Sequence, residues 1–214
     1  MKGKKLFYFA LFFSLIAILY GCNERNSRGY LEDRIGNQIS RVYPTKNLED
    51  LFEQFPNGFT IYQSYQLSDK FIDIILDGVE KGKPIEGTIK VINIDSGAEE
   101  KKIAVTYDAG KYSYDNEEEA RKLWPKEKFL FQEMTLNKEI LSKFKLKDTY
   151  YNRNSGGFDL EYTVKNEQIN EFLELENQPQ VTLGFHGSNA NRGYYYTLSV
   201  ELDKNFKFRE RIEE

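Results

Sequence analysis

Apolar and polar residues alternate along several short runs of the chain, which is the pattern of β-strands with one buried face. The runs 181–186 and 194–202 flank a segment rich in Gly and Asn, so we expect them to pair as a hairpin across residues 187–193. The run 71–76 also fits a short helix. The runs that we expect to form strands are 58–67, 71–76, 88–94, 102–107, 158–164, 181–186 and 194–202, with 88–94 and 102–107 as a further hairpin.

Short helices are expected between these runs. Leu48, Leu51, Phe52 and Phe55 have the spacing of one helix face, and Asn47 before them can cap the helix N-terminus. Further short helices are expected at 117–123, after Asn137 and after Asn166. Strands joined by short connections favour antiparallel pairing, and interspersed helices cover one face of the sheet. We therefore predict an α+β fold: a mainly antiparallel sheet with three to four short helices packed on one face.

Residues 1–21 have the three parts of a signal peptide, which are a basic end, an apolar run and a small residue. Residues 1–5 carry three lysines, residues 6–20 carry no charge, and Gly21 then precedes Cys22. A transmembrane helix needs about 20 apolar residues to cross the bilayer core. Because the apolar run is shorter than that, we expect a signal peptide that is removed from the mature protein.

Leu19, Tyr20, Gly21 and Cys22 resemble a bacterial lipobox, the leucine–small–small–cysteine signal of lipoproteins. The resemblance implies cleavage before Cys22 and a diacylglycerol thioether on its sulfur, with palmitate as an acyl chain. A thiolate is well suited to form a thioether, and two or more acyl chains hold a protein firmly where one chain is marginal. We therefore expect a lipid anchor at the extracytoplasmic face of the cell membrane.

The polar composition of residues 22–40 predicts a flexible membrane tether, which as a random coil would span roughly 20–25 Å. Leu31, Ile35 and Ile39 are spaced as on one face of a helix, so a short helix is the alternative. Residues 41–214 are then expected to form a single globular domain, which is long enough for a sizeable core.

The net charge limits the classes of binding partner, and the cysteine content excludes internal disulfides. The formal net charge is −4, and removal of the three lysines in residues 1–21 brings it to −7. A net negative protein is a poor ligand for nucleic acid, and it gains no polybasic attraction to anionic lipid. Because Cys22 is the only cysteine, no disulfide can form within the chain, and the domain must rely on its core.

Few residues of the sequence are candidates for catalysis or metal binding. His186 is the only histidine, so a metal site with two histidines is excluded and any Ser-His-Asp arrangement would depend on it. Alternation places His186 on the polar face of its strand, where we expect an ordinary exposed histidine. We predict no enzyme activity, no cofactor and no metal site. Tyr195 and Thr197 join His186 in a candidate contact patch, because exposed tyrosines are typical of protein and glycan contacts.

Two motifs resemble a known family. Residues 43–51 read Tyr-Pro-Thr-Lys-Asn-Leu-Glu-Asp-Leu, and residues 158–166 read Phe-Asp-Leu-Glu-Tyr-Thr-Val-Lys-Asn. Both are similar to the tandem lipoproteins, also called the conserved staphylococcal antigen family, although members usually carry a tryptophan in the first strand, where this chain has Phe59, Ile61 and Tyr62. The resemblance implies a surface lipoprotein of a Gram-positive bacterium that is encountered by host cells and immune receptors.

Two functions are consistent with these features. The first is a non-enzymatic, membrane-anchored surface protein that binds a host protein or immune receptor. The alternative is a lipid-tethered binding module for a peptide or small solute at the cell envelope. An enclosed apolar pocket with a few convergent polar groups would favour the solute binder, whereas a flat or convex face would favour the interaction protein.

Overall fold

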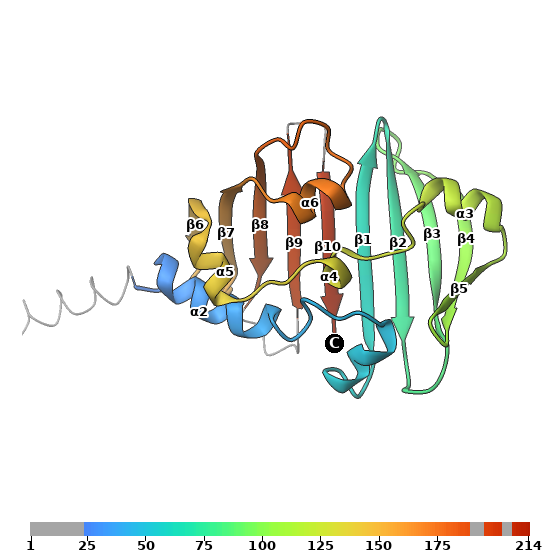
Figure 1. Cartoon of the computed structure of the whole chain (residues 1–214), viewed down its shortest axis with the longest axis horizontal. Helices are drawn as coiled ribbons and strands as arrows, with labels where there is room; N and C mark the ends of the chain where they lie inside the picture. The colour runs from blue at the N-terminus through green and yellow to red at the C-terminus, as the bar shows by residue number, and fades with distance from the viewer. Residues whose placement is uncertain (1–23, 189–194, 203–206) are drawn as a thin grey trace, which may run out of the picture.

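The computed structural model describes residues 24–188, 195–202 and 207–214, with the side chain of Tyr195 outside the description. Ten strands form one antiparallel sheet in the order β5-β4-β3-β2-β1-β10-β9-β8-β7-β6 (Figure 1). The strands are β1 Phe59–Leu67, β2 Lys70–Gly78, β3 Ile85–Asn93, β4 Glu99–Asp108, β5 Lys111–Tyr114, β6 Lys145–Tyr151, β7 Phe158–Val164, β8 Val181–Gly187, β9 Tyr195–Glu201 and β10 Lys207–Glu213.

The sheet consists of two runs of sequential antiparallel strands that meet at its centre. Strands β1 to β5 follow one another outward to one edge, and strands β10 to β6 run outward to the other. The two runs are joined by pairing of β1 with β10, from Thr60 opposite Glu213 to Tyr65 opposite Phe208. The C-terminal strand therefore lies at the centre of the sheet, where it connects the two halves.

The strands with clear alternation were predicted correctly. The burial of β7 alternates along its whole length, with Phe158 and Leu160 on the core face, and β8 pairs with β9 as the expected hairpin. Strands β5, β6 and β10 were missed. In β6 and β10 the apolar alternation is interrupted by charged residues, and β5 has only four residues.

Six short helices accompany the sheet in the described part of the chain: α2 Arg28–Ile39, the 3₁₀ helix η1 Leu48–Glu53, α3 Glu117–Leu123, α4 Leu130–Glu133, α5 Lys138–Lys143 and α6 Glu167–Phe172. Helices α2, α4, α5 and α6 lie on the same face of the sheet (Figure 1). The predicted α+β class with three to four helices is wrong, because helix makes up only 23% and, among the described residues, two helices alone reach seven residues. The additional strands turn the fold into a large sheet with small helices.

Residues 28–39 are part of the folded domain, which corrects the flexible tether predicted for residues 22–40. They form α2, whose Leu31, Ile35 and Ile39 are buried against the core. Arg28 extends from the start of α2 to α5, where its Nη2 donates to the main-chain oxygens of Leu141, Ser142 and Phe144. The alternative prediction of a short helix, from the spacing of Leu31, Ile35 and Ile39, is confirmed. The folded domain therefore includes α2 and does not begin at residue 41.

A buried carboxylate links the helical layer to the centre of the sheet. Glu210 on β10 accepts hydrogen bonds from the Tyr43 hydroxyl at 2.7 Å and from the backbone N–H groups of Leu130 and Phe131 at 2.6 and 2.9 Å. Desolvation by burial raises the pKa of Glu210 to about 7, although these three bonds oppose that shift. Glu210 therefore fixes α4 over the junction between β1 and β10.

The signal peptide and the lipobox residues Leu19, Tyr20, Gly21 and Cys22 lie outside the described residues. Within the described ranges, none of the helices has the length and apolar character needed to cross a membrane.

Candidate functional site

One face of the sheet is free of helices in the described structure, and we call it the open face. Its residues alternate with the core residues of each strand: the central ones are Tyr62, Ser64, Asp73, Thr197, Ser199, Arg209 and Arg211, together with Asp159 and His186. Antiparallel sheets commonly keep one face in water. The side chains here are mostly polar, yet they include cationic and aromatic groups that bind other molecules well.

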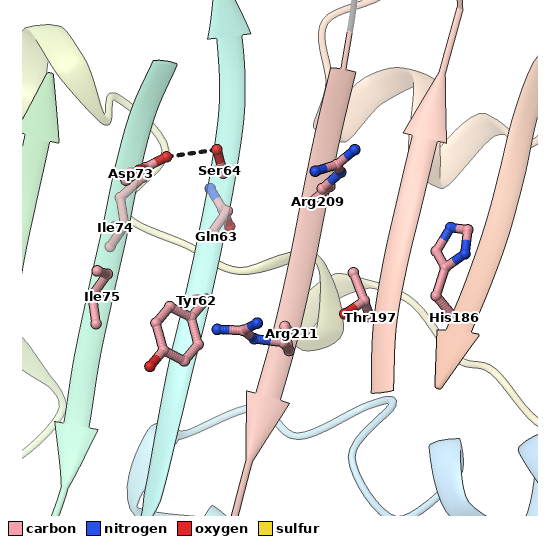
Figure 2. A pocket seen from close by; sticks show the side chains of 10 residues that line it. All are labelled: Tyr62, Gln63, Ser64, Asp73, Ile74, Ile75, His186, Thr197, Arg209 and Arg211. Carbon is pink, nitrogen blue, oxygen red and sulfur yellow. Dashed lines mark hydrogen bonds between the residues drawn. The ribbon is translucent and has the colours of Figure 1, made fainter. Parts of the chain in front are cut away.

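The open face is hollowed across its central strands. A shallow hollow of about 450 Å³ extends over β2, β1, β10, β9 and β8 (Figure 2). Tyr62, Asp73, His186, Thr197, Arg209 and Arg211 are among its lining residues. Because these residues come from both runs of strands, the hollow depends on the pairing of β1 with β10.

Arginine side chains form the centre of the hollow. The guanidinium carbon of Arg211 lies 4.0 Å from the ring centroid of Tyr62, a cation–π contact that Figure 2 shows from the side of the hollow. Arg211 Nε also lies 3.1 Å from a carboxylate oxygen of Glu213. Arg209 is exposed, and no hydrogen bond or ion pair joins it to the residues that the structure describes. Arg211 is thus held in place, while Arg209 remains available to a ligand.

A chain of hydrogen bonds crosses from β7 through β8 to β9 at the edge of the hollow. Asp159 Oδ1 lies 2.5 Å from His186 Nδ1, and His186 Nε2 lies 3.0 Å from Ser199 Oγ. The register brings these groups together, since Asp159 is opposite His186 and Ser199 is opposite Gly184. A Cβ on Gly184 would lie only 2.6 Å from Ser199 Oγ, so glycine leaves the space in which the histidine and serine meet.

The hydrogen-bonded order Asp–His–Ser is that of a serine hydrolase. From the sequence we expected an ordinary exposed histidine, without such partners. His186 does face away from the core, as the alternation predicted, but both of its ring nitrogens have partners. Ser199 is only 5% exposed and lies within a strand that is paired on both sides. Nucleophilic serines instead sit on sharp, exposed turns beside free backbone N–H groups, so the described part of this site lacks two features of a hydrolase.

The predicted contact patch is partly assembled. His186 and Thr197 are cross-strand neighbours, and both line the hollow, whereas the side chain of Tyr195 is outside the description. Sequence reasoning missed Arg209 and Arg211 because it did not recognise β10. The available signal was the apolar alternation of Phe208 and Ile212 around a central charged residue, which places the arginines between them on the opposite face.

Comparison with known proteins identifies no relative: no family model matches the chain, and no curated protein matches it significantly. Among the described residues, no group of three or more His, Cys, Asp or Glu side chains is arranged to hold a metal ion.

Proposed function

We propose that this protein is a lipid-anchored surface lipoprotein of a Gram-positive bacterium, of the tandem lipoprotein type, that binds a partner protein through the open face of its sheet. The observation that carries this proposal is the shallow hollow at the centre of that face, with an exposed Arg209 beside the Tyr62–Arg211 pair. Arginine and tyrosine are, with tryptophan, the side chains enriched where protein interfaces gain most of their binding energy. The partner in this proposal is a host protein or immune receptor, and the contact is non-enzymatic.

The shape of the hollow favours a macromolecular partner over a small solute. Small-molecule sites bury most of the ligand surface within apolar walls, whereas this hollow lies on the face of a sheet and has polar lining residues such as Asp73 and Thr197 (Figure 2). A folded partner can cover such a face and exclude water around its centre, which is the condition under which buried arginines contribute to affinity.

Site-specific photocrosslinking tests the proposal. A photoreactive amino acid at Thr197, in the hollow, should crosslink the mature protein on intact cells to host proteins, and the same group at Lys122 should not. Lys122 is an exposed residue of α3, which lies near the β4 end of the sheet, away from the central strands that line the hollow (Figure 1). The additional change Arg209→Glu should reduce crosslinking at position 197 at least tenfold, because it places a carboxylate where the partner meets a cation. Equal crosslinking from both positions would contradict the proposal.

A second candidate function, serine hydrolysis, is favoured by one observation, the hydrogen-bonded order Asp159–His186–Ser199. A fluorophosphonate probe distinguishes the two, since it reacts covalently with serines activated by a neighbouring base. If Ser199 is only structural, wild type and Ser199→Ala should show equally little labelling. Labelling that Ser199→Ala and His186→Ala both lose would establish the hydrolase and replace the non-enzymatic proposal.

A further inference from the structure

A second hollow lies on the opposite, helix-covered side of the sheet. It is about 130 Å³ in volume and lies over β1 and β10, between the segment that follows α3 and the end of α6. Aromatic side chains line it: Tyr65 on β1, Phe208 on β10, Trp124 after α3 and Phe172 in α6. Phe172 packs edge-on against Phe208, with ring centroids 5.8 Å apart. Aromatic walls of this kind favour a flat ring as the occupant, because rings prefer edge-on and offset contacts.

The side chain of Gln63 places a buried hydrogen-bond acceptor, without a donor in the described structure, at this hollow. This side chain lines the hollow and is only 3% exposed, and its Oε1 atom has no hydrogen-bond partner among the described residues. Buried acceptors in native proteins almost always have a donor, since leaving one unpaired is costly. A ligand that donates one hydrogen bond at this position would remove that cost.

The charges at the rim are already paired. Lys126 lies 3.2 Å from Glu174 and donates to the main-chain oxygen of Glu171, which bridges the two segments that flank the hollow. Lys128 lies 2.6 Å from Glu133. A charged ligand would have to compete with these ion pairs, so the hollow favours an uncharged one.

We infer that this hollow binds a single phenol ring, either as a free phenol or as the side chain of a tyrosine, with its O–H donating to Gln63 Oε1. A cavity of about 150 Å³ is known to hold one benzene ring, so a hollow of about 130 Å³ has room for one ring rather than two. The site lies on the opposite side of the sheet from the open face. Its existence does not depend on the proposed function, and each can fail without the other.

Trp124 provides a direct readout, because it is the only tryptophan of the chain and lines the hollow. The mature protein is titrated with phenol, with toluene and with N-acetyltyrosinamide, while the tryptophan is excited selectively. Phenol should change the fluorescence saturably and bind about two- to tenfold more tightly than toluene, which has the ring but no donor. Binding of N-acetyltyrosinamide as well would identify a tyrosine side chain as an acceptable source of the ring, and its failure would restrict the site to free phenols.

Two matched substitutions on β1 test the role of the acceptor. Gln63→Leu should keep toluene binding and abolish the preference for phenol, whereas Gln66→Leu, on the open face of the same strand, should leave that preference unchanged. If Gln63→Leu does not unfold cooperatively and is therefore not folded, Gln63→Met replaces it in this test. Absence of saturable binding would show that only water occupies the hollow and would overturn the inference. So would a phenol preference that survives the loss of Gln63 in a folded variant.

Discussion

At the scale of single residues, Glu210 illustrates how a charged position can belong to the core. It stands between Arg209 and Arg211, and the alternation of Phe208 and Ile212 around it is the only local sign that it shares their buried face. The register places it opposite Gln63 at the centre of the sheet, where three donors meet its carboxylate. The donors that satisfy its carboxylate could not be predicted from sequence, because they come from segments nearly 80 residues or more away.

The raised pKa of Glu210 predicts a pH dependence of stability. Between pH 4.5, its ordinary pKa, and about 7, its pKa in the folded protein, the unfolded chain releases this proton while the folded protein retains it. The contribution of this group to stability is therefore greatest below pH 4.5, and it falls by about 3 kcal/mol as the pH rises through this window. Urea unfolding of the mature protein at a series of pH values measures the effect.

The variant Glu210→Gln cannot titrate, so its free energy of unfolding should lose this slope whatever its absolute value. Glu213→Gln, a partly exposed neighbour on the same strand, should retain it. Surface carboxylates such as Glu99 and Glu119 have pKa values lowered by hydrogen bonds from Lys90 and Lys101. Their contribution to stability is lost only below pH 4.5, outside this window. A wild type whose stability is constant from pH 4.5 to 7 would refute this account of Glu210.

At the scale of elements, local patterns predicted helix positions better than helix roles. The segment 117–123 was predicted with its correct ends because Asn116 accepts from the backbone N–H of Glu119, as an N-cap does. Residues 28–39 were read first as a tether because most of them are polar. Only five residues of α2 are buried, and one of them is the charged Glu32, which accepts a hydrogen bond from the Tyr162 hydroxyl. The contacts that hold α2 come from α5 and β7.

Two glycines of α2 offer a matched pair of substitutions. A Cβ on Gly36 would lie 2.6 Å from backbone atoms of Lys138, whereas a Cβ on Gly29 would meet nothing within 4 Å. Alanine favours a helix over glycine by about 1 kcal/mol, so Gly29→Ala should raise the free energy of unfolding by about 0.5–1 kcal/mol. Gly36→Ala should lower it by about 1–3 kcal/mol, because α2 and α5 must move apart. Urea unfolding compares both variants with wild type, and a stabilised Gly36→Ala would show that the two helices are not in close contact.

Removal of α2 tests whether it is part of the domain. A chain that begins at Arg41 loses the buried side chains of Leu31, Ile35 and Ile39, and it exposes the core surface that they cover. Each such loss typically costs about 2–5 kcal/mol, so this chain should unfold at much lower urea or without cooperativity. A chain that begins at Asn23 should match the mature protein. Equal stability of the two chains would restore the independent domain of residues 41–214.

At the scale of the whole molecule, the sequence predicted seven of the ten described strands but not how the two halves join. The alternation in residues 158–164 and 181–186 depends on one buried face and is visible locally. The central pairing of β1 with β10 joins strands more than 140 residues apart. The open face, with Arg209 and Arg211 at its centre, exists only through that pairing. The candidate site was therefore predicted in part, at His186 and Thr197, and its arginines were not.

The position of α2 also changes where the proposed anchor would hold the domain. If the chain is lipidated on Cys22, only residues 23–27 separate the anchor from α2. A fully extended link of this length reaches about 20 Å at most. The start of α2, on the helix-covered side of the sheet, would then lie within about 20 Å of the membrane surface.

The lipid anchor itself gives the last prediction. Cells that express the wild type and are fed labelled palmitate should incorporate the label into the protein, and Cys22→Ser should abolish the incorporation and block cleavage before residue 22. The sulfur is the only thiol in the chain, so no other residue can form the thioether. The unprocessed variant keeps residues 1–21 with their three lysines, so its mass on a gel also reports the block in cleavage. Ser27→Ala, five residues further along, serves as the control and should keep both the palmitate label and the cleavage before residue 22. Unchanged palmitate incorporation in Cys22→Ser would contradict the lipobox and, with it, the proposed location of the protein.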